Sequence, residues 1–230
     1  HAIAWKIAQS PKVDKIYCAP GNGGIAELAE CVDIAATDIE NMVKFAKDNA
    51  IDLVMVAPDD PLVLGMVDAM EKEGIRAFGP RANAAIIEGS KAFSKELMKK
   101  YNIPTANYEV FTDSTSAIDY IKAQNTFPTV IKADGLALGK GVIIAQNLEE
   151  AEQAVHEMID DGKFGKSGSR VVIEEFLTGP EVSVLAFTDG KTVKPMVSAQ
   201  DHKRAYDNDE GLNTGGMGTF SPSRLYDDAK

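Results

Sequence analysis

Glycine and lysine residues gather between two short runs rich in β-branched residues, Thr129–Ala133 and Val142–Ala145. Glycine lets the backbone turn tightly and bring its N–H groups close to a ligand, and lysine neutralises negative charge. The segment therefore favours a β-hairpin that closes over nucleotide phosphates, although a plain glycine-rich turn remains an alternative. The residues concerned are Lys132, Gly135, Gly139, Lys140 and Gly141.

Two other glycine-rich segments do not have the spacing of a common nucleotide-binding loop. A P-loop needs Gly-x4-Gly-Lys-Ser/Thr before a helix. Gly165-Lys166-Ser167 has Asp160 where the first glycine would stand, so we interpret it as a polar turn. The segment at 21–24, Gly-Asn-Gly-Gly, lacks the Gly-x-Gly-x-x-Gly spacing of a dinucleotide loop.

Charge and composition limit the classes of partner. The 230 residues are 44% hydrophobic and 26% charged, as in an ordinary globular protein, and their net charge is −11. Nucleic acids and anionic membranes are bound through basic surface, so neither partner is expected.

Two cysteines, Cys18 and Cys31, are too few for a disulfide framework or a metal cluster, which indicates a reducing, cytoplasmic environment. No apolar run approaches the roughly 18 residues of a membrane helix.

The first 80 residues alternate short apolar runs with helical patterns. This alternation predicts an α/β fold with a parallel sheet, in which ligands lie at the carboxyl ends of the strands. Loops at 20–24 and 58–62 would lie at such ends. The expected strands are 15–19, 51–57 and 75–78, and the expected helices are 38–49 and 62–73.

A second α/β unit is expected after Gly79-Pro80, which marks a boundary. Ser90 can cap a helix there and would place Lys91 in its first turn. A cation at that position opposes the helix dipole at a cost of about 0.3–1 kcal/mol, which weakly indicates that Lys91 serves a ligand. An exposed lysine without a role is the alternative. The expected strands are 108–111, 129–133, 142–145 and 170–176, the expected helices are 114–124 and 148–160, and a hairpin is expected at 181–198.

Two further segments suit the recognition of a small polar molecule. The apolar strand at 171–177 carries adjacent glutamates, and its extended backbone suits an adenine edge, with Glu181 beyond it for ribose hydroxyls. A solvated hairpin is the alternative. Residues 201–204 (Asp-His-Lys-Arg) and 213–218 (Asn-Thr-Gly-Gly-Met-Gly) predict a long, charged, glycine-rich loop, in which Asp201 would be free to bind an amine. A loop of this length is unusual as a mere connection.

Together these segments resemble the phosphoribosylamine–glycine ligases (glycinamide ribonucleotide synthetases), a family of purine-biosynthesis enzymes in the ATP-grasp superfamily. The motifs lie at 88–93, 131–137, 174–177, 200–204 and 213–218, and the resemblance runs along the whole chain. It implies a Rossmann-like N-terminal parallel-sheet domain at 1–86 and a connecting helix at 87–106. ATP-grasp α+β subdomains would follow, a lid at 107–177 and the start of the core at 178–230.

The resemblance also implies a role for each matching residue. Lys91 and Lys132 would hold the ATP phosphates, and Glu181 would hold the ribose. The lid loop would contain Gly139, Lys140 and Gly141, and the adenine would be lined by Glu174, Glu175, Phe176 and Leu177. Glycine and the ribosylamine would be faced by Asp201, Asn213, Gly215, Gly216, Met217 and Gly218. The catalytic residues would be Lys132, Asp201 and Arg204.

The reaction implied by the resemblance joins glycine to 5-phosphoribosylamine. ATP phosphorylates the glycine carboxylate, and the ribosylamine then attacks this glycyl phosphate to give glycinamide ribonucleotide, ADP and phosphate. A cytoplasmic monomer is expected. No Gly-x-Ser-x-Gly elbow is present, so hydrolysis through an enzyme nucleophile is not expected.

The chain departs from the family pattern at its ends and at one loop. Only His1-Ala2 matches the Arg-Glu-His-Ala that ends the family's first loop, so the chain is expected to begin inside an element. The family's Mg²⁺ or Mn²⁺ ligands, a glutamate and an asparagine, are expected beyond Lys230, so no metal ligand is assigned here. We therefore expect the 230 residues alone to be inactive. At 58–62 the family usually has Pro-Glu-Ala-Pro-Leu, which leaves any substrate role of Asp59 open.

Two alternatives to this ligase remain. One is another ATP-grasp enzyme that uses formate or bicarbonate, against which Asp201 and the 213–218 segment argue. The other is a non-catalytic module that binds or senses a nucleotide.

Overall fold

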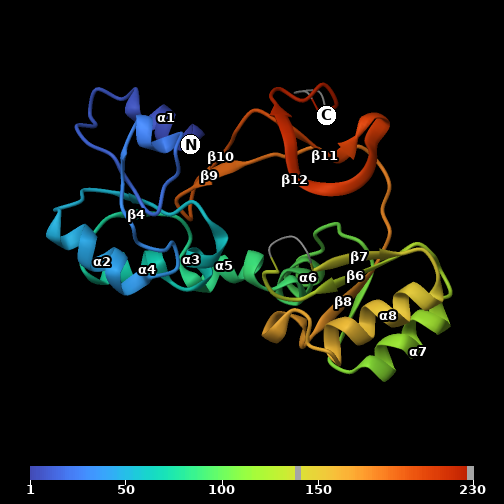
Figure 1. Ribbon diagram of the computed structural model, residues 1–230. Helices are drawn as coiled ribbons and strands as arrows, with labels where there is room; N and C mark the ends of the chain where they lie inside the picture. Colours follow the sequence, from blue (N-terminus) through green and yellow to red (C-terminus); the bar gives the residue numbers. More distant parts are fainter. Residues whose placement is uncertain (138–140, 227–230) are drawn as a thin grey trace. The chain divides into compact units, whose positions relative to one another are not determined.

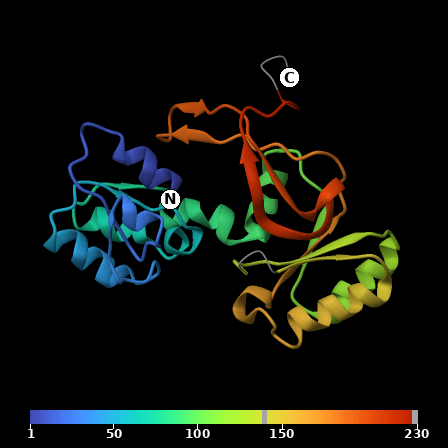
Figure 2. The same cartoon turned by 45° about the horizontal axis from the view of Figure 1, so that its top comes forward.

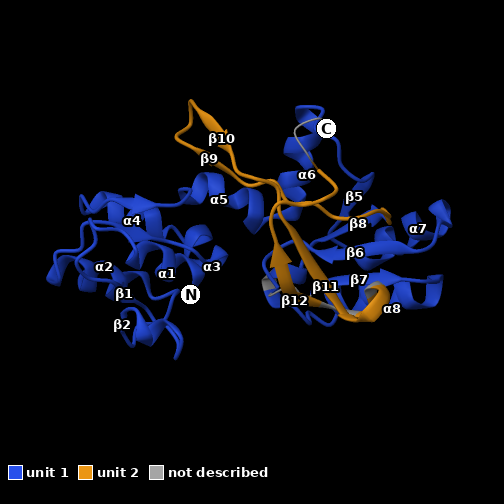
Figure 3. Cartoon of the chain, turned by 90° about the horizontal axis from the view of Figure 1, so that it is seen from above, with its two compact units in different colours: residues 1–175 blue, residues 176–230 orange. Residues whose placement is uncertain are grey.

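The computed structural model describes residues 1–137 and 141–226, with the backbone alone at 166, 209, 212 and 213. The chain divides into two compact units, residues 1–175 and 176–230 (Figure 3). The finer division at 86, 106 and 177 remains a prediction. In the described ranges no helix is both long and apolar enough to cross a membrane.

The first 80 residues contain two pairs of parallel strands, as the alternating pattern predicts (Figures 1 and 3). Tyr17 pairs with Glu30 in the first of them, and Val54 pairs with Ala77 in the second. Each pair extends over only two residues, so the strands are shorter than the apolar runs that predicted them. The elements are α1 (Ala2–Ala8), β1 (Tyr17–Cys18), η1 (Ile25–Glu27), β2 (Glu30–Cys31), α2 (Ile39–Asp48), β3 (Val54–Met55), α3 (Asp59–Val63), α4 (Met66–Lys72) and β4 (Ala77–Phe78).

The single helix predicted at 62–73 is wrong. Two short helices, α3 and α4, occupy this region. Gly65 between them has φ +89°, a left-handed conformation that glycine adopts without steric cost and that interrupts a helix. The second helix supplies most of a small buried cluster, which consists of Ala46, Val56, Met66, Val67 and Met70.

Two consecutive helices, α5 (Ala82–Gly89) and α6 (Lys91–Lys100), follow the parallel pairs. Ser90 is the N-cap of α6, as the sequence predicts. Its hydroxyl oxygen accepts a hydrogen bond of 3.1 Å from the backbone N–H of Phe93. Lys91 is therefore held in the first turn of α6.

A four-stranded antiparallel sheet in the order β5-β8-β6-β7 completes the first unit. Its strands agree with the predicted ones, except that β8 is one residue shorter at each end. Two helices, α7 and α8, contact each other and lie along one face of this sheet (Figures 1 and 2). The elements are β5 (Tyr108–Phe111), α7 (Ser114–Gln124), β6 (Thr129–Ala133), β7 (Val142–Ala145), α8 (Leu148–Ile159), η2 (Gly165–Gly168) and β8 (Val171–Glu175).

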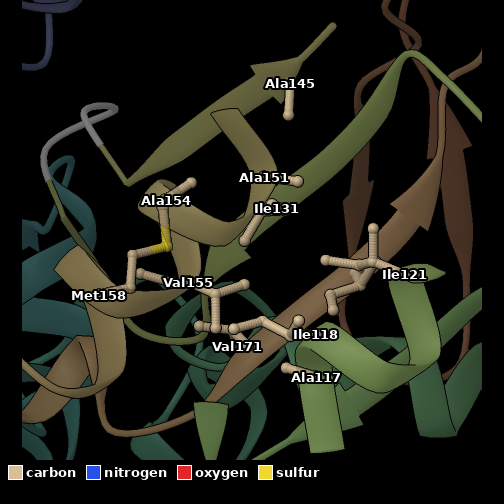
Figure 4. Close-up of a cluster of buried hydrophobic side chains, with 12 residues drawn as sticks. Ala117, Ile118, Ile121, Ile131, Ala145, Ala151, Ala154, Val155, Met158 and Val171 are labelled. Atoms are coloured by element: carbon tan, nitrogen blue, oxygen red, sulfur yellow. The ribbon is translucent and has the colours of Figure 1, made fainter. Parts of the chain in front are cut away.

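The core of this sheet lies between its strands and the two helices (Figure 4). Alternate residues of a strand point to opposite faces of its sheet. Ile131 and Ile173 point into this core, so their neighbours Lys132 and Glu174 point to the face away from α7 and α8. The hydrophobic pattern of β6 and β8 thus places a lysine and a glutamate together on the second face.

The second unit consists of two antiparallel strand pairs. The predicted hairpin around Asp189-Gly190 is confirmed, and the Asp189 carboxylate accepts hydrogen bonds from the backbone N–H groups of Lys191 and Thr192. Its elements are β9 (Ala186–Thr188), β10 (Val193–Pro195), β11 (Gln200–Tyr206), η3 (Asp207–Asp209) and β12 (Glu210–Phe220).

The long loop predicted at 201–218 is wrong. These residues form the antiparallel pair β11–β12, in which Asp201 pairs with Thr219 and His202 with Gly218. A ladder is made by backbone groups, so the charges and glycines that suggested a loop do not prevent it. Irregularities on both sides of Arg204 bend the pair instead of ending it.

The buried cluster of Figure 4 makes a prediction about stability. Met158 is fully buried in α8, whereas Met55 in β3 is 38% exposed. Met158→Ala should lower the free energy of unfolding by about 2–5 kcal/mol, because it leaves a cavity, and Met55→Ala should lower it by less. Urea denaturation measures both, and equal losses would contradict the assigned core.

Candidate active site

Two lysines from separate elements lie near each other in the first unit. Lys91 begins α6, and its ammonium group donates a hydrogen bond of 3.1 Å to the backbone oxygen of Gly135. Lys132 lies in β6, on the face away from α7 and α8. The backbone N–H of Lys91 donates a hydrogen bond of 3.0 Å to the backbone oxygen of Asp134, two residues after Lys132, so the start of α6 lies against the end of β6. The structure therefore brings together the pair that the sequence predicts as phosphate-binding residues.

A buried aspartate at the end of β6 connects these two elements. The Asp134 side chain is only 12% exposed. It accepts hydrogen bonds from the Ser90 hydroxyl at 3.0 Å and from the backbone N–H of Ala92 at 2.7 Å, both at the start of α6. Arg170 donates to the same carboxylate through Nε at 2.9 Å. Asp134 thus holds the first turn of α6, and with it Lys91, against the strand that carries Lys132.

A second buried carboxylate lies between two lysines. Glu174 of β8 is 5% exposed, and its Oε2 atom lies 3.0 Å from Lys132 Nζ and 3.2 Å from Lys95 Nζ. Lys132 and Glu174 are diagonal neighbours across β6 and β8, while Lys95 reaches the strand from α6. A buried carboxylate remains charged only when it is well compensated, and here two cations compensate it.

The glycine-rich turn after β6 is described at its two ends. The backbone oxygen of Gly141 accepts a hydrogen bond of 2.8 Å from the N–H of Ala133, which closes the hairpin. A β-carbon on Gly141 would lie 2.7 Å from that of Ala137, so only glycine fits there. Gly139 and Lys140, both predicted for the lid, lie outside the described residues.

The protonation of Lys91 reflects its partly buried position. Burial lowers the pKa of its ammonium group from the ordinary value of 10.5. The carboxylates of Asp134 and Glu88 oppose this shift, Lys132 adds to it, and Glu174 opposes it weakly. An anion bound beside Lys91 would favour its charged form, which is the property expected of a lysine that binds phosphate.

The segment predicted to line adenine spans the boundary between the units. The Glu174 side chain is occupied by the two lysines, and Asn107 donates a hydrogen bond of 2.7 Å to the carboxylate of Glu175. The backbones of Phe176 and Leu177 make no hydrogen bond to the described residues. Main-chain recognition of an adenine edge therefore remains a prediction for these two residues.

In the second unit, the residue predicted to hold the ribose, Glu181, and one predicted substrate residue, Asp201, lie beside the same lysine. Lys203 Nζ lies 2.7 Å from Glu181 Oε2 and 3.3 Å from Asp201 Oδ2. The hydrogen bond with Glu181 is the main cause of a raised pKa of Lys203. Arg204 donates to the backbone oxygen of Gly211. Because Glu181 and Asp201 belong to the second unit, their place beside the nucleotide lysines remains a prediction.

The remaining predicted substrate residues lie in β12. Gly215, Gly216 and Gly218 are exposed, and the Met217 side chain is 60% exposed. Thr214 lies before them, and its hydroxyl donates to the backbone oxygen of Lys203 at 2.8 Å and accepts from the N–H of Gly216 at 3.0 Å. The side chain of Asn213 is outside the described residues. The substrate role of this strand remains a prediction.

The described side chains offer no metal site of their own. Within residues 1–137 and 141–226, no group of three His, Cys, Asp or Glu side chains could hold a metal ion. His156 is paired with Asp160 one helical turn away on α8, at 2.6 Å. The described side chains therefore supply no such group of three for Mg²⁺ or Mn²⁺.

Comparisons with known proteins identify the class and then the family. The profile described as "Phosphoribosylglycinamide synthetase, N domain" matches residues 1–88, and the profile described as "Phosphoribosylglycinamide synthetase, ATP-grasp (A) domain" matches residues 89–230. A Rossmann-like parallel α/β region followed by a lysine-bearing antiparallel sheet is thus an ATP-grasp architecture. The chain belongs to the phosphoribosylglycinamide synthetase family.

Individual relatives agree with this family. A phosphoribosylamine–glycine ligase of Halalkalibacterium halodurans is 54% identical over 230 residues, which are 100% of this chain and 54% of the relative. One from Haemophilus influenzae is 55% identical over 97% of this chain and 52% of the relative. The crystal structure of a phosphoribosylamine–glycine ligase from Thermotoga maritima is 33% identical, has a TM-score of 0.81, and is matched over 98% of this chain and 54% of that chain. The chain spans about half the length of the curated relatives it matches.

Three residues of the site escaped the sequence analysis: Lys95, Asp134 and Arg170. A signal for the first was present, because Lys95 follows Lys91 by four residues and so shares its helix face. Another signal was Glu174 within the apolar run of β8, since a carboxylate in a buried strand needs a cation nearby. The partners of Asp134 are separated from it by more than 30 residues and have no local pattern.

The close packing of the glycine turn gives a second prediction. Gly141→Ala would place a β-carbon 2.7 Å from that of Ala137 and 3.1 Å from that of Ala133. We expect the free energy of unfolding to fall by about 1–3 kcal/mol, measured by chemical denaturation. Gly23 has nothing within 4 Å of the same position, so Gly23→Ala is the matched control. Equal effects of the two substitutions would contradict the packed turn.

The lowered pKa of Lys91 gives a third prediction. Lys91 binds its proton less tightly in the folded chain than in the unfolded chain, so its contribution to stability rises as the pH rises towards 10.5. Lys91→Met removes this contribution, so its unfolding free energy should change less favourably than that of the wild type between about pH 7 and about pH 10. Lys99→Met, which removes an exposed lysine of the same helix, should show the wild-type change. The same change in all three proteins would exclude the shift.

Proposed function

We propose that this protein ligates glycine to 5-phosphoribosylamine at the expense of ATP and forms glycinamide ribonucleotide, ADP and phosphate. The observation that carries the proposal is the placement of Lys91 and Lys132 on adjoining elements, α6 and β6, beside a glycine turn in a member of this family. The 54% identity to a named phosphoribosylamine–glycine ligase supports the choice of substrates.

The lysines of the first unit bind the polyphosphate in this proposal. Lys91 and Lys132 offset negative charge on the transferring phosphoryl group, and the turn that ends at Gly141 covers it. Residues 174–177 take the adenine, and Glu181 takes the ribose. Asp201, Arg204 and the strand at 213–218 hold glycine and the ribosylamine in position. The protein thus orients the reactants and forms no covalent bond to them.

The chemistry consists of two substitutions. First, an oxygen of the glycine carboxylate attacks the γ-phosphorus of ATP. A new P–O bond forms, the bond to the bridging oxygen breaks, and ADP leaves. The ribosylamine nitrogen then attacks the acyl carbon of glycyl phosphate. A C–N bond forms, the C–O bond to phosphate breaks, and the nitrogen releases a proton.

A divalent cation, Mg²⁺ or Mn²⁺, belongs to the proposal as the companion of ATP. The described side chains include no set that fits it. We therefore assign it no ligand and no step here. Lys91 and Lys132 supply the positive charge of their ammonium groups.

Product analysis of the full-length protein tests the reaction. We expect ADP release to require glycine and 5-phosphoribosylamine together, and formate or bicarbonate not to replace glycine. ADP release with formate or bicarbonate would instead indicate another ATP-grasp enzyme. ATP binding without ADP release under any of these conditions would indicate a nucleotide-binding module.

Calorimetry of ATP binding tests the site. Lys132→Ala should weaken ATP binding by about tenfold to a hundredfold, because it removes one charged hydrogen bond to phosphate. Lys99→Ala removes an exposed lysine from α6 and should leave the affinity unchanged. Unchanged affinity in Lys132→Ala would remove this lysine from the site.

A further inference from the structure

The two lysines at Glu174 differ in how firmly they are held. Lys95 Nζ donates hydrogen bonds to Thr105 Oγ1 at 2.7 Å and to the backbone oxygen of Ala106 at 3.4 Å, and it forms an ion pair with Glu174 Oε2 at 3.2 Å. Its ammonium group is therefore held by three contacts. It also lies 5.5 Å from the centre of the Tyr108 ring. Lys95 is thus fixed in place.

Lys132 is held much less firmly. Its side chain is 28% exposed, against 10% for that of Lys95. Among the described residues Glu174 is its one hydrogen-bond or ion-pair partner, so two of its three donors are available. Lys132 can therefore turn to an incoming anion, whereas Lys95 cannot do so without breaking three contacts.

The movement of Lys132 has an electrostatic consequence for Glu174. If Lys132 were the only cation there, its departure would leave a carboxylate buried at 5% exposure without compensation, which is strongly unfavourable. Lys95 avoids this cost because it stays paired with Glu174 whether or not Lys132 moves away. One negative and two positive charges give this cluster a surplus positive charge before any ligand binds.

We propose that Lys95 is a positioning residue that neutralises Glu174 permanently and so releases Lys132 to bind the phosphates of the nucleotide. The inference rests on the proposed function, since it assumes that Lys132 contacts phosphate. Lys95 itself touches no substrate. Its effect on the reaction passes through the charge of Glu174 and the freedom of Lys132.

Binding of ADP to the full-length protein, measured by calorimetry, tests the proposal. In Lys95→Met, Lys132 is the one cation that still pairs with Glu174 among the residues that the structure describes, so the carboxylate retains it. We expect the dissociation constant of ADP to rise by about tenfold or more. In the double variant Lys95→Met/Glu174→Gln no charge needs compensation, so ADP affinity should return to within about threefold of that of Glu174→Gln alone.

The double variant separates this role from a purely structural one. It also keeps the test valid if Lys95→Met fails to fold, because the double variant buries no unpaired charge. Loss of ADP affinity on adding Lys95→Met to Glu174→Gln, or unchanged affinity in a folded Lys95→Met, would overturn the proposal. A wild-type protein that binds no ADP would instead overturn the proposed function, on which this proposal rests.

Discussion

A carboxylate taken out of water must keep a cation or several hydrogen bonds beside it, and this requirement organises the first unit. Asp134 meets it with the start of α6 and with Arg170. Glu174 meets it with Lys95 and Lys132. Both carboxylates draw partners from α6 or its N-cap, and further partners from β6 or from the residue just before β8. The helix and the sheet are therefore joined through charge, and the lysines are positioned by the same contacts.

Lys91 of the first unit and Lys203 of the second unit differ in how their charge is compensated. Lys91 has a carbonyl as its hydrogen-bond acceptor, and burial lowers its pKa. Lys203 is paired with Glu181 and Asp201, and its pKa is raised. A lysine whose charge is poorly compensated gains most from an anionic ligand, whereas one already paired with carboxylates gains little. This contrast supports Lys91 and not Lys203 as a residue for phosphate.

Local patterns predicted much of the fold for identifiable reasons. The β-branched and apolar runs of β6 and β8, the capping serine before α6 and the Asp189-Gly190 turn all act over a few residues, so they are visible in the sequence. The two wrong predictions also came from local patterns in the sequence. Gly65 divides a helix that its apolar pattern suggested was continuous, and β11–β12 is held by backbone pairing that charged and glycine residues conceal.

The sequence alone determined which residue types are available for chemistry: the lysines, the glycine turn and the acidic end of an apolar strand, because residue type sets charge and backbone freedom. The tertiary structure decided which of them meet. Residues 42 positions apart, Lys132 and Glu174, form an ion pair, and Lys95 joins them from α6, although its helical spacing relates it only to Lys91. Such pairings depend on the crossing of α6 and the register of β6 with β8, which are set by the burial of apolar side chains elsewhere in the unit.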